Sequence, residues 1–351
     1  MQSKLTKSKD KARTAFAGGE SAVTLESVAK AAGVSPSTVS RILNGTAKVS
    51  EDKVRAVNAA VAKLGFLPNP VARSLARGRS MSIGVVSQAI DSPFYGEALA
   101  SIEKGLLRAS YTPMFASGHW REEDERRCID HLLSRRVDGI ILITSCLPDT
   151  WLLSLAKRVP LVLTGRKVAS PRVICLDFDH VPGARLAVDY LIGQGHKRIA
   201  FLGGPTGHPD AVQRYEGYRA ALESHRLTFS SRLVAVGDYT YSGGFQAMQQ
   251  LLTSKVDFSA VFAANDESAQ GALLALHRQG LRVPQDISLV GFDDLPSSAY
   301  TIPPLTTVHR STDQIGEAAA DAMINLIEGR PATPKHSSPT LAIRESTRPW
   351  R

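Results

Sequence analysis

The apolar positions of the chain follow two different patterns, one before and one after residue 80. Before it, apolar residues recur at helical spacing in short stretches, whereas after it short runs of Val, Ile and Leu alternate with longer amphipathic stretches. Continuous apolar strands joined by helices are typical of parallel sheets that are covered on both faces. The pattern therefore predicts a small all-α head followed by an α/β core.

A series of short apolar runs provides the candidate strands of this core. They span residues 83–86, 113–116, 139–143, 161–163, 173–176, 198–202, 233–236, 260–263 and 287–291. The helical patterns between them include residues 94–108, 122–136, 182–194 and 267–279. Because the core is too long for one compact sheet, we expect two α/β lobes with a cleft between them.

The same patterns predict the order of domains. A flexible basic tail (1–22) precedes a helix-turn-helix domain (23–68), a hinge helix or linker (69–80), the core (81–345) and a C-terminal tail (346–351). One lobe of the core spans about 81–178 and 311–331, and the other about 179–308 with the C-terminal segment. The basic tail is either merely solvated or adds non-specific contacts to DNA.

Residues 24–45 carry the pattern of a helix-turn-helix. Gly33 can adopt the positive φ that a sharp turn between two helices requires. Ser35 suits the N-cap of the second helix and Pro36 its first position. Caps are also present for the first helix at Thr24 and for a third helix at Ser50. The apolar face of the second helix carries Val39, Ile42 and Leu43.

The opposite face of the second helix carries short or planar hydrogen-bonding side chains. These are Ser37, Thr38, Ser40, Arg41 and Asn44. Such groups read base edges in a major groove, which makes this helix a candidate recognition helix. The hairpin alone fits equally well with an ordinary alanine-rich pair of helices that has a polar solvent face.

The charge distribution decides between these two interpretations. The formal net charge is +9, and residues 1–80 hold 14 Lys or Arg against 5 Asp or Glu, whereas the rest of the chain holds 28 of each. All of the excess positive charge therefore belongs to the segment with the helix-turn-helix. A basic patch in that position is typical of binding to the phosphate backbone of DNA.

Residues 69–78 have the pattern of a short helix, with Asn69 as cap, Pro70 at the first position and Gly78 beyond the end. A helix of this length is marginal in water, so we expect it to fold only when it docks, as on DNA. Leu75 could then wedge between base steps of the minor groove. Three arginines could neutralise phosphates, namely Arg73, Arg77 and Arg79. A plain interdomain linker is the alternative.

Several classes of function are not expected. Cys128, Cys146 and Cys175 match no zinc, redox or disulfide spacing and are expected to be reduced core thiols. No apolar run approaches the roughly 20 residues of a membrane span, and no apolar signal core precedes the head. The motifs of phosphate-binding loops, dinucleotide sites, nucleophile elbows and zinc proteases are missing from the sequence. We therefore expect neither catalysis nor a cofactor, metal site or membrane segment.

A series of short motifs, each present once, is spread in order along nearly the whole chain. In the head they occupy residues 24–29, 37–45, 68–69 and 71–75, and in the core residues 91–95, 136–141, 195–203, 264–266, 291–294 and 303–308. Together they closely resemble the LacI/GalR family of bacterial transcription regulators. The resemblance implies a homodimer that binds near-palindromic operator DNA, and a core like that of periplasmic binding proteins that holds a small effector.

The resemblance also implies which residues contact DNA. Together with the residues indicated by the helix and linker patterns, the candidate DNA contacts are Ser35, Ser37, Thr38, Arg41, Asn44, Arg73 and Leu75. Ser37, Thr38 and Arg41 would face bases, whereas Leu75 would be the lever in the minor groove. Pro36 stands where some sugar-responsive members have a base-reading tyrosine, so we do not expect direct readout at that position.

A second set of positions implies an effector site. These are Gln88, Phe94, Tyr95, Arg214, Tyr239, Asn265 and Asp293. In a site of this kind Asp293 would accept hydrogen bonds from sugar hydroxyls, Arg214 would donate, and Asn265 would do both. The rings of Phe94 and Tyr239 would clamp the apolar face of the sugar.

One position departs from the sugar-responsive pattern. Gly165 stands where many sugar-responsive members have an aspartate, so the resemblance does not identify the sugar. Arg166 beside it could favour an acidic sugar or a sugar phosphate, or it could be an exposed loop arginine.

The sequence as a whole predicts a cytoplasmic DNA-binding regulator that is associated with the nucleoid when bound. We expect a repressor of carbohydrate-utilisation genes whose operator affinity is lowered by a sugar-type effector. A corepressor-dependent regulator with a purine-type or sugar-phosphate ligand would use the same parts, and a non-regulatory sugar-binding protein is a third alternative. No leucine heptad follows Ile343, so a dimer is expected rather than a tetramer.

Overall fold

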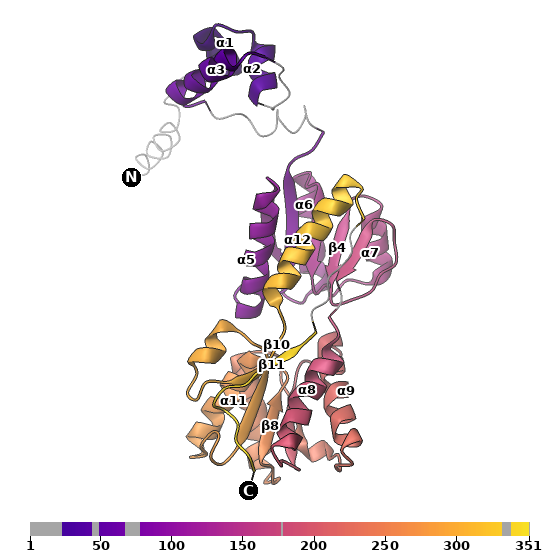
Figure 1. Cartoon of the computed structure of the whole chain (residues 1–351). Coiled ribbons are helices and arrows are strands. Elements are labelled where there is room, and N and C mark those ends of the chain that lie inside the picture. The colour runs from indigo at the N-terminus through magenta and orange to yellow at the C-terminus, as the bar shows by residue number, and fades with distance from the viewer. Residues whose placement is uncertain (1–22, 44–48, 67–77, 177, 332–337, 351) are drawn as a thin grey trace, which may run out of the picture. The chain divides into compact units, whose positions relative to one another are not determined.

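The computed structural model describes residues 23–43, 49–66, 78–176, 178–331 and 338–350 (Figure 1). It divides into two compact units, residues 1–80 and 81–351. The predicted DNA contacts Asn44, Arg73 and Leu75 lie outside the described residues, as do the predicted basic tail and most of the predicted hinge helix.

Three helices build the described part of the first unit, namely α1 (Leu25–Ala32), α2 (Pro36–Leu43) and α3 (Glu51–Leu64). Thr24 caps α1 in a reciprocal capping box, and Gly33 ends it at a φ of 65°. Val28, Val39 and Val57, one from each helix, are 0% exposed in a common core. The apolar faces that the sequence predicts therefore hold the helices together.

Two sheets form the centres of the two lobes of the second unit. The sheet of lobe 1 has the order β2-β1-β3-β4-β5, with strands Thr112–Ser117, Ser82–Ser87, Gly139–Ile143, Leu161–Thr164 and Val173–Leu176. The sheet of lobe 2 has the order β11-β10-β9-β8-β6-β7, with strands Thr340–Ala342, Thr306–His309, Ser288–Asp293, Ala260–Ala263, Ile199–Gly203 and Val234–Val236. Among the strands described, only β11 runs antiparallel to its neighbour. The expected parallel strands are confirmed.

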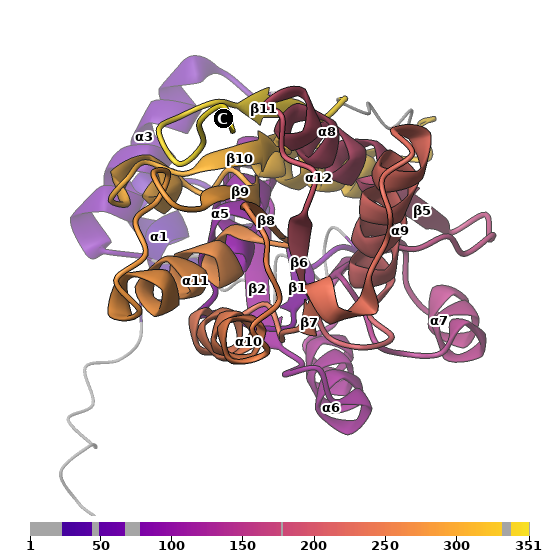
Figure 2. The same ribbon diagram turned by 90° about the horizontal axis from the view of Figure 1, so that it is seen from below.

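Helices cover both faces of each sheet. They are α5 (Pro93–Arg108), α6 (Glu122–Ser134), α7 (Asp149–Ala156), α8 (His180–Gly193), α9 (Pro209–Ser224), α10 (Tyr241–Thr253), α11 (Asp266–Arg278) and α12 (Thr312–Glu328), with 3₁₀ turns η1 (Ser231–Leu233) and η2 (Pro296–Tyr300). In lobe 1, α5 and α12 pack opposite α6 and α7. In lobe 2, α8 and α9 pack opposite α10 and α11, as Figure 2 shows.

Helix α12 follows β10 of lobe 2 but packs in lobe 1 beside α5, so two segments far apart in the sequence lie side by side (Figure 1). Two glycines allow the close approach. A Cβ atom at Gly105 would lie 2.5 Å from the Cβ of Ala320, and one at Gly316 would lie 2.7 Å from the carbonyl oxygen of Ala98. The chain therefore returns to lobe 1 between β10 and α12.

Strands β10 and β11 have no predicted counterpart. β10 begins with Thr306 and Thr307, which are both 0% exposed although they are polar. β11 is a three-residue edge strand that pairs with β10 alone among the described strands. Neither segment forms the continuous apolar run by which buried parallel strands are identified.

The expectation that the chain ends in a tail after residue 345 is wrong for the described residues. Ser346 is 0% exposed, and its Oγ donates to the carbonyl of Leu289 at 2.6 Å and accepts from the amide of Thr306 at 2.8 Å. The amide of Trp350 donates to the carbonyl of Gln194 at 2.8 Å. Hydrogen bonds therefore attach this polar segment to lobe 2, although its composition is that of a solvated end.

The three cysteines form no disulfide, but they are not all in the core. Cys128 and Cys175 are half-buried, whereas Cys146 is exposed, so the expectation of a core thiol is wrong for Cys146. Its Sγ donates to Oε2 of Glu125 at 3.0 Å. None of the described helices is long and apolar enough to cross a membrane.

Candidate DNA-binding and effector-binding sites

Helix α2 buries one face and exposes the other. Val39 is fully buried, and Ile42 and Leu43 pack against the same core, as the helical spacing predicts. Ser37 and Arg41 are exposed one turn apart, where Nε of Arg41 donates to the carbonyl of Ser37 at 3.3 Å. The exposed face therefore presents a hydroxyl and a guanidinium group together.

Ser35 starts α2. Its Oγ accepts from the amide of Thr38 at 3.2 Å, so the predicted capping role is confirmed. The same oxygen lies 2.9 Å from Oγ of Ser37 and 2.8 Å from Oγ1 of Thr38. Three hydroxyl groups thus form one network at the positive end of the helix dipole. Their contact with DNA stays a prediction.

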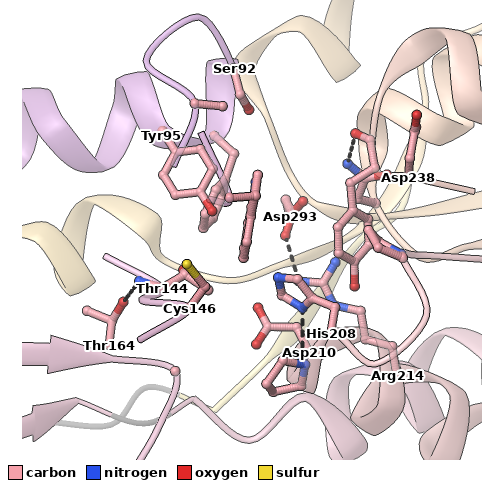
Figure 3. Close-up of a pocket in the computed structure, with 18 of the residues that line it drawn as sticks. Ser92, Tyr95, Thr144, Cys146, Thr164, His208, Asp210, Arg214, Asp238 and Asp293 are labelled. Atoms are coloured by element: carbon pink, nitrogen blue, oxygen red, sulfur yellow. Dashed lines mark hydrogen bonds and ion pairs between the residues drawn. The ribbon is translucent and has the colours of Figure 1, made fainter. Parts of the chain in front are cut away.

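A cleft of about 1170 Å³ lies between the two lobes. Its lining residues come mostly from loops at the carboxyl ends of parallel strands in both sheets, which is where α/β folds place their ligands. Figure 3 shows Tyr95, Thr144 and Cys146 of lobe 1 facing Asp210 and Arg214 of lobe 2. The volume is sufficient for a ligand of the size of a mono- or disaccharide.

Arg214 and Asp293 form a buried ion pair on the lobe 2 side of the cleft. Both side chains are 4% exposed, and Nη2 of Arg214 lies 3.3 Å from Oδ1 of Asp293. Nη1 of Arg214 donates to the carbonyl of Ala264, and its guanidinium carbon lies 4.0 Å from the ring centroid of Phe292. Burial lowers the pKa of Arg214, but the charge of Asp293 raises it on balance. The pair places a donor and an acceptor side by side in the cleft.

Asp210 adds a second carboxylate beside this pair. Its Oδ2 lies 3.3 Å from Nε2 of His180, whose Nδ1 accepts from Nε of Arg214 at 3.3 Å. Burial lowers the pKa of His180 to about 4, so this imidazole is neutral at pH 7. Burial would raise the pKa of Asp210, but the charges and hydrogen bond around it hold that pKa far below its usual range. Asp210 is therefore an ionised acceptor.

Asn265 and Tyr239 are held together. Asn265 caps α11 through Oδ1, which accepts from the amide of Ser268 at 3.1 Å, and its Nδ2 donates to the carbonyl of Tyr239 at 2.8 Å. Tyr239 has a φ of 69°, and its ring lies edge to face with His208 at 5.3 Å between centroids. Asn265 therefore orients Tyr239 in addition to lining the cleft.

Lobe 1 contributes aromatic rings at the start of α5. The centroids of Phe94 and Tyr95 lie 5.2 Å apart in an edge-to-face arrangement, and both residues line the cleft. At the N-cap of the same helix, Oγ of Ser92 donates to Oε2 of Glu267 at 2.9 Å. Because Glu267 belongs to lobe 2, this hydrogen bond links the lobes at the edge of the cleft.

Gln88 does not line the cleft, unlike the other predicted effector residues. It is 1% exposed, and its Nε2 donates to the carbonyl of Thr144 at 2.7 Å and to Oε2 of Glu125 at 3.2 Å. Its Oε1 accepts from the amide of Trp120 at 2.9 Å. The amide group thus holds two loops of lobe 1, and a role of Gln88 in the effector site stays a prediction.

Arg166 lines the cleft, but its guanidinium group is used within lobe 1. Nη1 donates to the carbonyls of Ser145 at 3.2 Å and Leu147 at 2.6 Å, and Nη2 pairs with Asp149. These contacts favour a loop arginine over a residue that selects an acidic sugar.

The cleft is also lined by residues that the sequence analysis did not predict, among them Trp120, His208, Asp210, Glu267 and Arg310. The first four follow predicted strands, so their position at strand ends was an available signal. Arg310 follows β10, which the apolar pattern does not reveal. Among the described residues, no three His, Cys, Asp or Glu side chains are grouped so that they could hold a metal ion.

Comparison with known proteins agrees with this architecture. Residues 24–69 match the bacterial regulatory proteins of the lacI family, and residues 188–347 match the periplasmic binding protein-like domain. The ribose operon repressor of Escherichia coli (strain K12) is 35% identical over 87% of this chain and 93% of its own length. The regulator GalR of the same strain is 36% identical over 92% of this chain and 95% of its own length.

Solved structures agree over nearly the whole chain. The lac repressor dimer bound to operator and the anti-inducer ONPF has a TM-score of 0.83 and 31% identity, covering 93% of this chain and 99% of that one. The complex of the transcriptional regulator CelR with cellobiose has a TM-score of 0.70 and 33% identity, covering 92% and 99%. The chain therefore belongs to the LacI family of bacterial transcription regulators.

Proposed function

We propose that this regulator is a repressor that binds a near-palindromic operator as a homodimer, and that a small polyol in the cleft lowers its affinity for DNA. The observation that carries the proposal is the presence, on one chain, of a helix-turn-helix and of a two-lobed cleft with the buried Arg214–Asp293 pair. The relatives support it, because one is named a ribose operon repressor and another is solved with cellobiose. The protein would act in the cytoplasm by binding alone, without catalysis.

On the DNA side, α2 would enter the major groove. Ser37, Thr38 and Arg41 lie on the face that the core leaves accessible, and they offer hydroxyl and guanidinium groups to base edges. The net charge of +9, all of it from residues 1–80, would attract the phosphate backbone.

On the effector side, the ligand would contact both lobes. Asp293 would accept hydrogen bonds from hydroxyl groups and Arg214 would donate to oxygens, while the rings of Phe94 and Tyr239 would contact the apolar face of the sugar. A ligand that touches both lobes favours one arrangement of them over another. The change in operator affinity is limited by this difference, which is commonly about 1 to 3 kcal/mol, or 5- to 150-fold.

The test is a measurement of operator affinity. The full-length protein would select its operator from random-sequence duplexes, and its affinity would be measured at one salt concentration with sugars and purines added in turn. We expect one class of sugar to weaken binding by about 5- to 150-fold. A ligand that tightens binding would make the protein corepressor-dependent, and failure to prefer any duplex over random DNA would contradict the proposal.

The oligomeric state is checked separately. We expect sedimentation to show a dimer, because two helix-turn-helix units are needed to read both halves of a near-palindrome. A stable tetramer would contradict this expectation.

A further inference from the structure

Arg310 occupies a particular place in the cleft. It directly follows β10, where the chain returns from lobe 2 to lobe 1, and it is 7% exposed. Its guanidinium carbon lies 4.7 Å from the ring centroid of Phe94 in lobe 1 and 4.8 Å from that of Phe178, which precedes α8. Since aromatic rings cover the face of the group, hydrogen bonds can form only at its edges.

Two hydrogen-bond donors at the edges of this guanidinium group have no acceptor among the described residues. Nε and Nη1 of Arg310 are buried and have no hydrogen-bond partner within the described parts of the chain. Oδ1 of Asp293 lies 3.8 Å from Nη1, which is an ion-pair distance but too long for a hydrogen bond. The same oxygen lies 3.3 Å from Nη2 of Arg214. One carboxylate oxygen therefore serves two buried guanidinium groups.

The two arginines differ in how well their charge is compensated. Burial lowers the pKa of both, but for Arg214 the effect of Asp293 prevails, whereas for Arg310 burial prevails and the pKa falls below its usual value. Asp210, an ionised carboxylate nearby, forms its hydrogen bond with His180 instead. A buried charge without hydrogen bonds is costly unless a ligand supplies them.

We infer that the effector carries an acidic group, a carboxylate or a phosphate on a polyol, and that Arg310 binds this group. The inference rests on the proposed function, namely that the cleft holds the effector. An anion offers several oxygens and a negative charge to a guanidinium group, whereas a hydroxyl offers one neutral acceptor. We therefore assign recognition of the acid to Arg310 and not to Arg166. Arg166 donates hydrogen bonds to loop carbonyls, whereas Nε and Nη1 of Arg310 have no hydrogen-bond partner among the described residues.

The position of Arg310 connects this recognition to the two lobes. Its guanidinium group contacts Phe94 of lobe 1 and Asp293 of lobe 2. An anion bound there would draw Arg310 toward itself and leave the Arg214–Asp293 pair to bind the hydroxyl groups of the same molecule. The acidic group would therefore bind where the chain crosses between the lobes.

The experiment compares neutral and acidic forms of one sugar on the full-length protein. The probes are galactose, galacturonate and galactose 6-phosphate, with the corresponding series for glucose and ribose, measured by calorimetry. The fluorescence of Trp120 provides a second readout, because this side chain is 43% exposed and its ring lies 4.8 Å from that of His208 in the cleft. We expect at least one acid to bind ten times or more as tightly as its neutral sugar, and the uronate and phosphate arms separate the two acids.

Variants test the role of Arg310 itself. Arg310→Gln should abolish the preference for the acid, whereas Arg310→Lys should keep part of it. The matched control is Arg282→Gln, an exposed arginine paired with Asp286 at 3.0 Å, which should change no affinity. Arg310→Gln should also unfold at the same or a higher temperature than the wild type, because it removes a poorly compensated buried charge.

The outcomes separate the inference from the proposed function. A neutral sugar that binds as tightly as its acids, or an acid preference that survives in Arg310→Gln, overturns the inference and leaves the effector cleft in place. Marked destabilisation of Arg310→Gln shows that Arg310 is compensated within the protein and also overturns it. Failure of every probe to bind contradicts both the inference and the proposed function.

Discussion

At the scale of single residues, one carboxylate in the cleft, that of Asp293, is paired with two arginines. Asp293 is the acceptor that a polyol would use, and it is also the carboxylate that lies within 3.3 Å of Arg214 and 3.8 Å of Arg310. The proposed effector binding and the stability of lobe 2 would therefore depend on the same side chain.

We expect Asp293→Asn to lower both effector affinity and stability. The change leaves two buried guanidinium groups without their shared counter-charge, and breaking a buried pair in this way costs about 3 kcal/mol or more. Urea denaturation measures the stability and calorimetry the effector affinity. Operator affinity of the folded variant should be unchanged, because the residues that are predicted to contact DNA belong to the other unit.

The control for this prediction is Asp257→Asn. Asp257 pairs with Arg198 at 3.5 Å, but its side chain is 89% exposed. An exposed pair of this kind contributes at most about 1 kcal/mol, so the control should remain near the wild type. Equal stability of Asp293→Asn and the wild type would show that the arginines are compensated by other groups.

Arg41→Ala tests the recognition helix. The loss of an arginine that reads a base should weaken operator binding by about 1 to 3 kcal/mol and relax the preference for one base pair. Effector affinity should be unchanged. Binding to the operator and to its single-base variants, measured at one salt concentration, checks the prediction.

The comparison for Arg41 is Arg55→Ala in α3. Arg55 is exposed and pairs with Asp52 at 2.5 Å, so its removal changes the charge of the head without touching α2. If both variants weakened all DNA sequences equally, Arg41 would be a phosphate contact instead of a base reader.

At the scale of elements, Gly105 is one of the glycines that allow α5 to pack closely on α12. A Cβ atom at Gly105 would lie 2.5 Å from the Cβ of Ala320, closer than two such atoms can approach. A Cβ atom added at Gly96, on the same helix, would have no neighbouring atom within 4 Å. The two glycines therefore have opposite roles in one helix.

We expect Gly105→Val to destabilise the core by about 1 to 3 kcal/mol, because it forces the two helices apart. Gly96→Ala should be neutral or should stabilise it by about 0.5 to 1 kcal/mol, because alanine restricts the unfolded chain without a clash. Chemical denaturation measures both. Equal effects of the two substitutions would contradict the packing described here.

The elements also show what local sequence reveals. Apolar runs such as Gly139–Ile143 identify buried parallel strands because every side chain along them must be apolar. Helix α2 is identified by its spacing and by its start at Ser35 and Pro36. Strand β10 is not identifiable in this way, since Thr306 and Thr307 are buried through hydrogen bonds to distant residues, among them Ser346 and Asp266.

At the scale of the whole molecule, the lobes are linked by Ser92 and Glu267, 175 residues apart in the sequence. Burial raises the pKa of Glu267 to about 7, well above the value of about 4.3 for an exposed glutamate. The Glu267 carboxyl group therefore binds its proton more tightly in the folded protein than in the unfolded chain. The resulting stabilisation is complete below about pH 4 and is lost as the pH rises through 7.

Glu267→Gln should therefore gain stability relative to the wild type between pH 5 and pH 8, by about 1 kcal/mol after allowance for solvent screening. The difference between the two proteins is the quantity to measure, because His180 titrates in the opposite sense: its folded pKa of about 4 makes it stabilising as the pH rises. Glu103→Gln, at an exposed position of α5, is the control. A difference that does not vary with pH would contradict the assignment.

The sequence by itself determined the head, the two-lobed parallel core and six of the residues that line the cleft. It could do so because helix caps, apolar spacing and strand ends are local features, and because Phe94, Asn265 and Asp293 lie in short motifs that can be recognised directly. These features need no knowledge of which segments meet.

Only the tertiary structure decided how the polar groups are used. Gln88 and Arg166 donate hydrogen bonds to loop carbonyls of lobe 1, whereas two nitrogens of Arg310 have no hydrogen-bond partner among the described residues. Arg310 and Arg214 share the carboxylate of Asp293, and Asp293 and Arg214 are 79 residues apart in the sequence. A hydrogen bond depends on distances of a few tenths of an ångström between such distant segments, and no local pattern contains that information.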